Sequence, residues 1–166
     1  MDITKYAILK KLAGGGGGGS GHEIEDALVT GTLTEYTNDR VTSICNYAFY
    51  ERNQLASVGF PAATSIGVYA FSTCSKLTSA YFPAATSIGN SAFSGCEKLT
   101  SLILRVTTQV CTLSNTDAFS DTPIASGTGY IYVPAALIDS YKTATNWTTY
   151  ANQFRAIEDY PEITGG

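Results

Sequence analysis

Hydrophobic residues recur at a fixed interval of 22 positions from residue 33 onward. Residues 55–76, LASVGFPAATSIGVYAFSTCSK, and 77–98, LTSAYFPAATSIGNSAFSGCEK, are identical at 15 of 22 positions. Self-similarity at a period of 20–29 residues predicts a solenoid, in which each unit buries its apolar face on its neighbours. The repeated apolar positions are Leu33, Leu55, Leu77 and Leu99; Ile44, Ile66, Ile88 and Val110; and Ala48-Phe49, Ala70-Phe71 and Ala92-Phe93.

Each unit contains the spacing of a short strand. Leu77, Ala80 and Phe82 follow an L-x-x-L-x-L pattern, in which the fourth and sixth residues share one face. The third and fifth residues point the other way. A proline follows in the middle units and ends the strand, because it has no N–H for the ladder. The residues expected on the outward face are Ser57, Gly59, Ser79, Tyr81, Ser101 and Ile103, with Arg105 at the rim.

The pattern changes at both ends of the repeats. Ala118-Phe119 follows Ala92-Phe93 by 26 residues, which implies a four-residue insertion within residues 106–117. Residues 24–36 are expected to form a strand-rich N-terminal cap. After the repeats, Tyr130-Ile131-Tyr132-Val133 predicts a closing strand. Two helices are expected to follow it, one opened by Pro134 and running through Leu137, Ile138 and Tyr141, the other marked by Trp147, Tyr150, Ala151 and Phe154.

The N-terminal 21 residues have a different composition. An apolar stripe at three- and four-residue intervals predicts a docking helix over residues 1–13, with a frayed tail as the alternative. Residues 14–21, mostly Gly, have the composition of a flexible linker. We therefore divide the chain into that helix, the linker, a solenoid over 22–129 and a C-terminal cap over 130–166. The stripe that would contact a partner consists of Ile3, Tyr6, Ala7, Leu9 and Leu12.

The repeats resemble the BspA-type leucine-rich repeat, whose unit is roughly LtsixlPxxxtsIGxyAFxgCxx. The match covers residues 33–124 and is closest over 55–98. The resemblance implies a short α+β solenoid of about four repeats, with a parallel sheet on one face, and a binding or adhesive role without catalysis. Cys45 departs from the pattern, since it stands where later units have Gly67 and Gly89. The helical start, the poly-Gly run and the C-terminal segment also resemble small phage or prophage structural proteins of gut Firmicutes.

Composition and charge narrow the possible functions. The net charge is −4, with ten Lys and Arg against fourteen Asp and Glu, so we expect no nucleic-acid partner. No apolar run approaches the roughly 18 residues that would cross a bilayer, and Lys10-Lys11 breaks the only candidate signal sequence. We therefore expect neither membrane insertion nor a secretory signal.

Catalytic and metal chemistry are not expected either. The single histidine, His22, adjoins the poly-Gly run, which offers no rigid position for an acid or base. Asp117 and Asp121 lack the spacing of a calcium loop. The four cysteines, without CxxC spacing, are expected to be small buried hydrophobes, and stacked Cys74 and Cys96 would run parallel rather than form a bridge. We expect no catalytic residue, metal or cofactor.

The remaining hypothesis is binding by the outward sheet face. The candidate ligand-binding residues are Ser57, Ser79, Tyr81, Ser101, Ile103 and Arg105. Among them, Tyr81 would supply contact area and Arg105 a charged donor, and both properties suit protein or glycan recognition. Plain solvent exposure is the alternative for such small polar residues.

Taken with residues 1–21, this face suggests a virion protein that docks to a particle through its N-terminal helix and contacts a host surface through its repeats. A bacterial cell-surface or extracellular adhesin is the alternative, and an enzyme with a hidden site in 125–160 is a third. A tethered docking helix is also compatible with a homo-oligomer on a symmetric platform.

Overall fold

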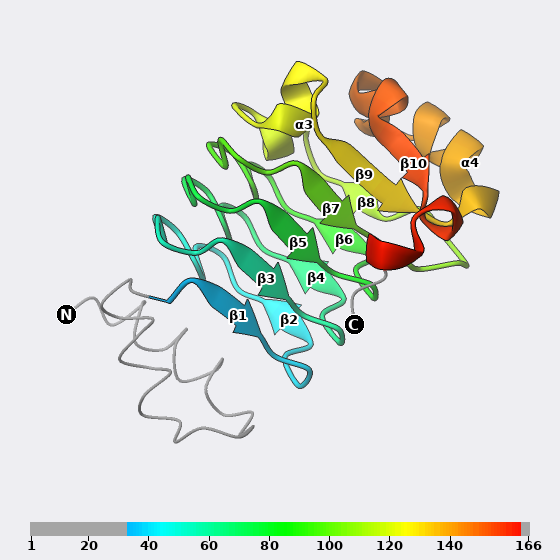
Figure 1. Ribbon diagram of the computed structural model, residues 1–166. Coiled ribbons are helices and arrows are strands. Elements are labelled where there is room, and N and C mark those ends of the chain that lie inside the picture. The colour runs from blue at the N-terminus through cyan, green and yellow to red at the C-terminus, as the bar shows by residue number, and fades with distance from the viewer. Residues whose placement is uncertain (1–32, 164–166) are drawn as a thin grey trace.

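Successive turns of the chain lie side by side, and each of the first four adds one strand to each of two parallel sheets (Figure 1). The computed structural model describes residues 33–163. The wider sheet has the strand order β1-β3-β5-β7-β9-β10 and the narrower one β2-β4-β6-β8. The predicted fold class, a short α+β solenoid, is confirmed.

The strands are short and the helices are confined to the C-terminal part of the described chain. The wider sheet consists of β1 Glu35–Thr37, β3 Ser57–Gly59, β5 Ser79–Tyr81, β7 Ser101–Ile103, β9 Tyr130–Val133 and β10 Phe154–Ala156. The narrower sheet consists of β2 Ser43–Ile44, β4 Ser65–Ile66, β6 Ser87–Ile88 and β8 Thr112–Leu113. The helices are α3 Pro123–Ser126 and α4 Ile138–Thr143, with 3₁₀ helices at Thr116–Phe119, Ala135–Leu137, Trp147–Gln153, Ile157–Asp159 and Pro161–Ile163.

The strand register follows the 22-residue repeat until the fourth coil. Ser57 pairs with Ser79 and Ser79 with Ser101. In the narrower sheet, however, Ile88 pairs with Leu113 rather than with Val110. The predicted equivalence of Val110 is therefore wrong, because most of the insertion precedes β8 and displaces the register there. The exposed residues 107–109 form the bulge.

A column of phenylalanine rings runs through the core between the two sheets. Phe49, Phe71, Phe93 and Phe119 stack with centroid separations of 5.0, 5.3 and 5.7 Å and nearly parallel planes. All four rings are fully buried. Offset or stacked aromatic pairs contribute about 0.5–1.5 kcal/mol beyond the burial of their area, so the column stabilises every junction between coils.

Both ends of this column are covered by larger aromatic side chains. At the first coil, Tyr36 stands where later coils have Val58 and Ala80, and its ring lies 5.6 Å from that of Phe49. At the other end, Trp147 lies 5.9 Å from Phe119. The non-repeated residues at the two ends therefore close a core that the repeats alone would leave open.

Side chains of the C-terminal cap also form hydrogen bonds with backbone groups at the edge strand β8 and its neighbouring residues. Tyr141 accepts the Cys111 N–H at 3.0 Å, and the Trp147 indole N–H donates to the Cys111 carbonyl at 2.6 Å. The Asn146 side-chain amide donates to the Leu113 carbonyl at 2.7 Å, and the Tyr150 hydroxyl donates to the Thr116 carbonyl. Buried or edge backbone groups need such partners, so these side chains replace the strand that a further repeat would supply.

The cap differs from its prediction at one strand. Helix α4 follows β9 as expected, but Phe154 begins β10 instead of continuing a helix. Phe154 pairs in register with Ile131, points into the core and is 4% exposed. Trp147, Tyr150 and Phe154 have the spacing of a helix. In the structure, Trp147 and Tyr150 lie on a 3₁₀ helix that ends at Gln153, and Phe154 begins the strand that follows.

Two repeated glycines allow the narrow corners of neighbouring coils to approach. A Cβ atom on Gly89 would lie 2.7 Å from the backbone of Gly67 and Val68. One on Gly67 would lie 2.6 Å from the Cys45 carbonyl carbon. Such distances are not tolerated, so both positions require glycine.

We predict that Gly89→Ala lowers the free energy of unfolding by more than about 2 kcal/mol, because the added methyl group meets backbone that cannot rotate away. Urea denaturation monitored by Trp147 fluorescence would measure the change. Gly59→Ala is the matched control, since its Cβ would meet only the exposed Thr37 side chain, at 3.1 Å, and should cost much less. Equal losses in the two variants would contradict this explanation.

Candidate binding surface

The outward face of the wider sheet carries two rows of side chains that cross the strands. Pairing from strand to strand sets the first row as Glu35, Ser57, Ser79, Ser101 and Tyr130. The second row consists of Thr37, Gly59, Tyr81, Ile103, Tyr132 and Arg155. Neighbouring positions in each row are about 4.8 Å apart, the spacing of paired strands.

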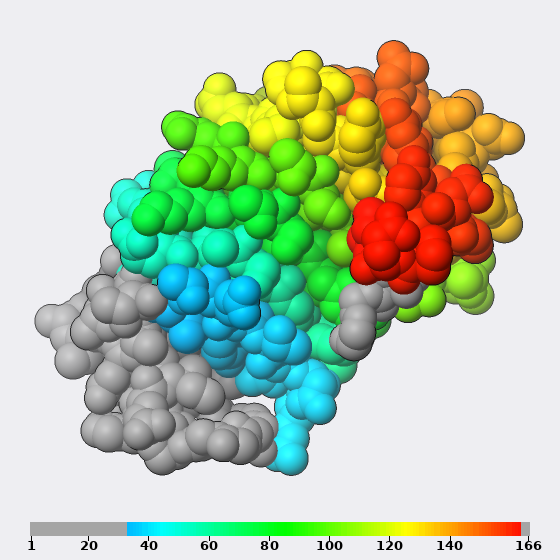
Figure 2. All heavy atoms as spheres, in the orientation of Figure 1, coloured from blue at the N-terminus to red at the C-terminus, as the bar shows by residue number. Residues whose placement is uncertain are grey.

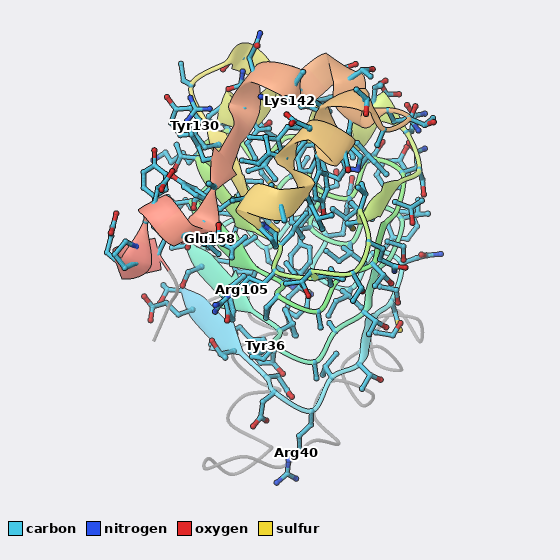
Figure 3. All side chains as sticks on the ribbon, turned by 90° about the vertical axis from the view of Figure 1, so that its right-hand side faces the viewer. Tyr36, Arg40, Arg105, Tyr130, Lys142 and Glu158 are labelled. Atoms are coloured by element: carbon cyan, nitrogen blue, oxygen red, sulfur yellow. The ribbon has the colours of Figure 1, made fainter. Side chains whose placement is uncertain are left out.

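The predicted site residues fall into three environments on this face. Ser57, Ser79 and Ser101 are half-buried and form a continuous row of hydroxyl groups. Arg105 is exposed, just beyond β7, with its backbone N–H donating to the Pro83 carbonyl at 3.2 Å. Figure 3 shows Arg105 on the same side of the molecule as Tyr36, below Glu158.

Ile103 points outward as expected but is only 5% exposed. It belongs to a small apolar cluster with Tyr132 and Ile157, separate from the main core, and Tyr81 packs at its edge. The expectation that Ile103 offers open surface is therefore wrong, because a segment from the C-terminal end covers it. Tyr81 is half-buried and packs against this cluster.

The covering segment, residues 157–163, is called the C-terminal strap below. It consists of two 3₁₀ turns that lie in front of the ends of the sheet strands in Figure 1. The space-filling view shows it as a raised border (red) (Figure 2). On the first strand, by contrast, Glu35 and Thr37 are exposed. The sheet face thus has an open half and a covered half.

An aromatic and cationic group at the last strands was not foreseen. The Arg155 guanidinium lies 4.2 Å from the centre of the Tyr130 ring, and Tyr160 packs edge-on against Tyr132 at 5.2 Å. The alternation of Tyr130 and Tyr132 in the predicted closing strand places both on the outward face, so this pair could have been found from the sequence. Arg155 could not, because residue 154 was assigned to a helix.

Charges around this group are mixed. Burial raises the pKa of the Tyr132 phenol, as does the neighbouring Tyr160, while the Arg155 guanidinium opposes the rise. Glu158, Asp159 and Glu162 are exposed on the strap, and the Glu158 carboxylate accepts the Ala135 N–H at 3.0 Å. Tyr132 therefore remains a neutral hydroxyl at physiological pH.

The cysteine thiols lie away from this face, in the core. Cys74 and Cys96 donate to the carbonyls of Phe49 and Phe71 at 3.0 and 3.1 Å, and all four cysteines are free thiols. Contact with the Cys74 thiol, together with burial, raises the pKa of Cys96, and burial raises the pKa of Cys111 to about 12. The thiolate forms of Cys96 and Cys111 are therefore scarce, and these two groups are poor nucleophiles.

Residues 33–163 offer neither a metal site nor a membrane-spanning helix. Among these residues, no group of three His, Cys, Asp or Glu side chains could hold a metal ion. The same part of the chain has no helix long and apolar enough to cross a membrane. His22 and the docking residues Ile3, Tyr6, Ala7, Leu9 and Leu12, with the linker at 14–21, lie outside the described residues.

Stacked coils with paired rows of outward side chains define the class of leucine-rich-repeat solenoids. A family model described as the BspA type leucine rich repeat region (6 copies) matches residues 31–134. This match covers more than half of the chain, which therefore belongs to the BspA-type leucine-rich-repeat family. No curated protein matches the chain.

We predict that a thiol reagent such as dithionitrobenzoate labels Cys45 alone in the native protein at pH 8, and all four cysteines in urea. Cys45 is half-buried, whereas the other three are fully buried. Absorbance of the released thionitrobenzoate would count the labelled thiols. Cys45→Ser should abolish native labelling, and rapid labelling of that variant would contradict the assigned burial.

Proposed function

We propose that this chain is a non-enzymatic binding protein that is displayed on a phage virion and contacts a protein or glycan on a host surface. The observation that carries the binding part is the open half of the sheet face. There the hydroxyl groups of Ser57, Ser79 and Ser101 form a straight row beside the half-buried Tyr81. Members of the repeat family are typically non-enzymatic, which agrees with this role.

The physical basis for recognition is a rigid row of donors and acceptors. Because the strands are hydrogen-bonded in register, the serines are held at fixed separations before any ligand arrives. Pre-organised contacts lose less entropy on binding than flexible ones. Tyr81 adds apolar area at low entropy cost, and Arg105 lies beyond the end of its strand as an exposed cation. An extended ligand crossing the strands would meet all of these groups.

Display on a particle rests on the sequence of residues 1–21. The apolar stripe from Ile3 to Leu12 would dock on a virion protein, and the glycine linker would leave the solenoid free to reach its target. Several copies on a symmetric particle would raise the effective affinity of a weak surface contact.

We predict that Ser79→Arg weakens binding to whole cells of the bacterial host, or to purified gut mucin, by at least about tenfold, because a long cation blocks the centre of the row. The matched control is Ser87→Arg, which makes the same change at a half-buried serine of the narrower sheet. Flow cytometry and biolayer interferometry would measure the two targets. Equal binding by both variants would place the contact elsewhere on the protein.

We predict that deletion of residues 1–13 leaves a folded solenoid that no longer co-purifies with phage particles. Density-gradient sedimentation of particles assembled with either form would measure incorporation, and circular dichroism would confirm folding. Unchanged incorporation would contradict the virion role. Recovery of the full chain on the bacterial surface instead, accessible to protease on intact cells, would favour the adhesin alternative.

A further inference from the structure

The apolar cluster on the sheet face lies outside the main core. It contains three buried side chains, those of Ile103, Tyr132 and Ile157, whereas the main core runs through the whole solenoid. Tyr81, Tyr130, Tyr160 and Ile163 pack around it and remain partly exposed. The strap that completes the cluster therefore adds little to the burial that holds the coils together.

The strap contacts the sheet through side chains at three-residue intervals. Ile157 and Ile163 belong to two successive 3₁₀ turns, Tyr160 joins the turns, and all three side chains pack in the apolar cluster. The Tyr160 N–H donates to Ile157 and the Ile163 N–H to Tyr160, at 3.1 and 3.0 Å, so these backbone bonds are internal to the strap. This arrangement differs from β10, which pairs with β9 through its backbone.

The covered and open halves of the face form one continuous surface. The second row runs from Thr37 and Gly59 on the open side, past Tyr81 at the edge of the cluster, to Ile103 under the strap. A polypeptide that occupied the strap position could continue across the open strands β1 and β3. The apolar cluster that the strap completes includes no residue of these two strands. Such a ligand would gain contacts that the strap lacks, and this difference supplies a driving force for displacement.

Charge also restricts what fits there. The strap places Glu162 close enough to the Tyr132 hydroxyl to influence it, and Arg155 acts on the same hydroxyl with the opposite sign. Arg105 is exposed at the neighbouring strand end. Acidic residues between the apolar ones therefore suit this end of the face, as they do in the strap itself.

We propose that Tyr81, Ile103, Tyr130 and Tyr132 form a peptide-docking site that the chain's own residues 157–163 fill in the isolated protein. The ligand is a polypeptide segment with apolar or aromatic side chains at every third position and acidic residues between them, and it binds by displacing the strap. The inference deepens the proposed function, because it uses the covered half of the same face and selects a polypeptide partner over a glycan.

The test uses the full chain with Tyr160→Ser and Ile163→Ser, which releases the strap. The probe is the acetylated and amidated peptide IEDYPEI, the sequence of residues 157–163. The released variant should bind the peptide at least about tenfold more tightly than the wild type, in which the strap competes. Heteronuclear NMR should show the largest shifts at Ile103 and Tyr132.

Two control variants make the result specific. Asp159→Asn with Glu162→Gln changes the exposed side of the strap and leaves its apolar contacts, so this variant should not gain the tenfold affinity of the released chain. Adding Ile103→Asp to the released variant should abolish binding. The proposal would be overturned if the released variant bound the peptide no more tightly than the wild type does. It would also be overturned if the NMR shifts were confined to residues other than Ile103 and Tyr132.

A second measurement covers the case in which the released variant fails to fold. In the wild type, a saturating concentration of the peptide should accelerate hydrogen exchange at the Tyr160 and Ile163 amides by at least about fivefold, while the Leu102 amide remains protected. Unchanged exchange at saturation would overturn displacement. If the peptide does not bind, the docking proposal fails. The proposed function is tested separately, by whether Ser79→Arg weakens host binding, so the two proposals can fail independently.

Discussion

The stacking of each coil on a near copy of itself is the constraint on which the rest of the structure depends. Interior positions of one repeat contact the same positions of the next, so a residue type that recurs at such a position must pack against itself. Phenylalanine meets this requirement in the ring column from Phe49 to Phe119. Glycine meets it at Gly67 and Gly89, where the backbones approach too closely for a Cβ atom. Charged side chains would not be stable in this core. The two repeats over 55–98 carry only Lys76, Glu97 and Lys98 as charged residues, and repetition of such a unit contributes to the low charged share of the chain, 14%.

Sequence periodicity was enough to predict the solenoid, the strand positions and the outward serines, because these follow from contacts one repeat apart. The register of the fourth coil was not predictable at the same accuracy. Val110 preserves the 22-residue spacing, but the inserted residues leave Leu113 to fill the core position beside Ile88. Periodicity identifies an insertion and its total length, whereas packing decides which residue returns to the register.

The candidate site was foreseen only in its open half. Ser57, Ser79 and Ser101 face outward because strand alternation requires it, and they remain half-buried rather than covered by the strap cluster. The burial of Ile103 depends on Ile157, which lies far along the sequence. The three-residue spacing of the strap spans only seven residues, too few to distinguish it from a loop by pattern. Local rules therefore gave the direction of each side chain, and tertiary contacts decided its exposure.

The two ends of the solenoid have a consequence for how such a protein changes in length. Tyr36 closes one end of the core and the Trp147 region the other, while the units between them contact only their own copies. Gain or loss of a whole 22-residue unit in the interior would leave both closures intact. The wider sheet could then change in width in steps of about 4.8 Å, the separation of paired strands, without a new fold.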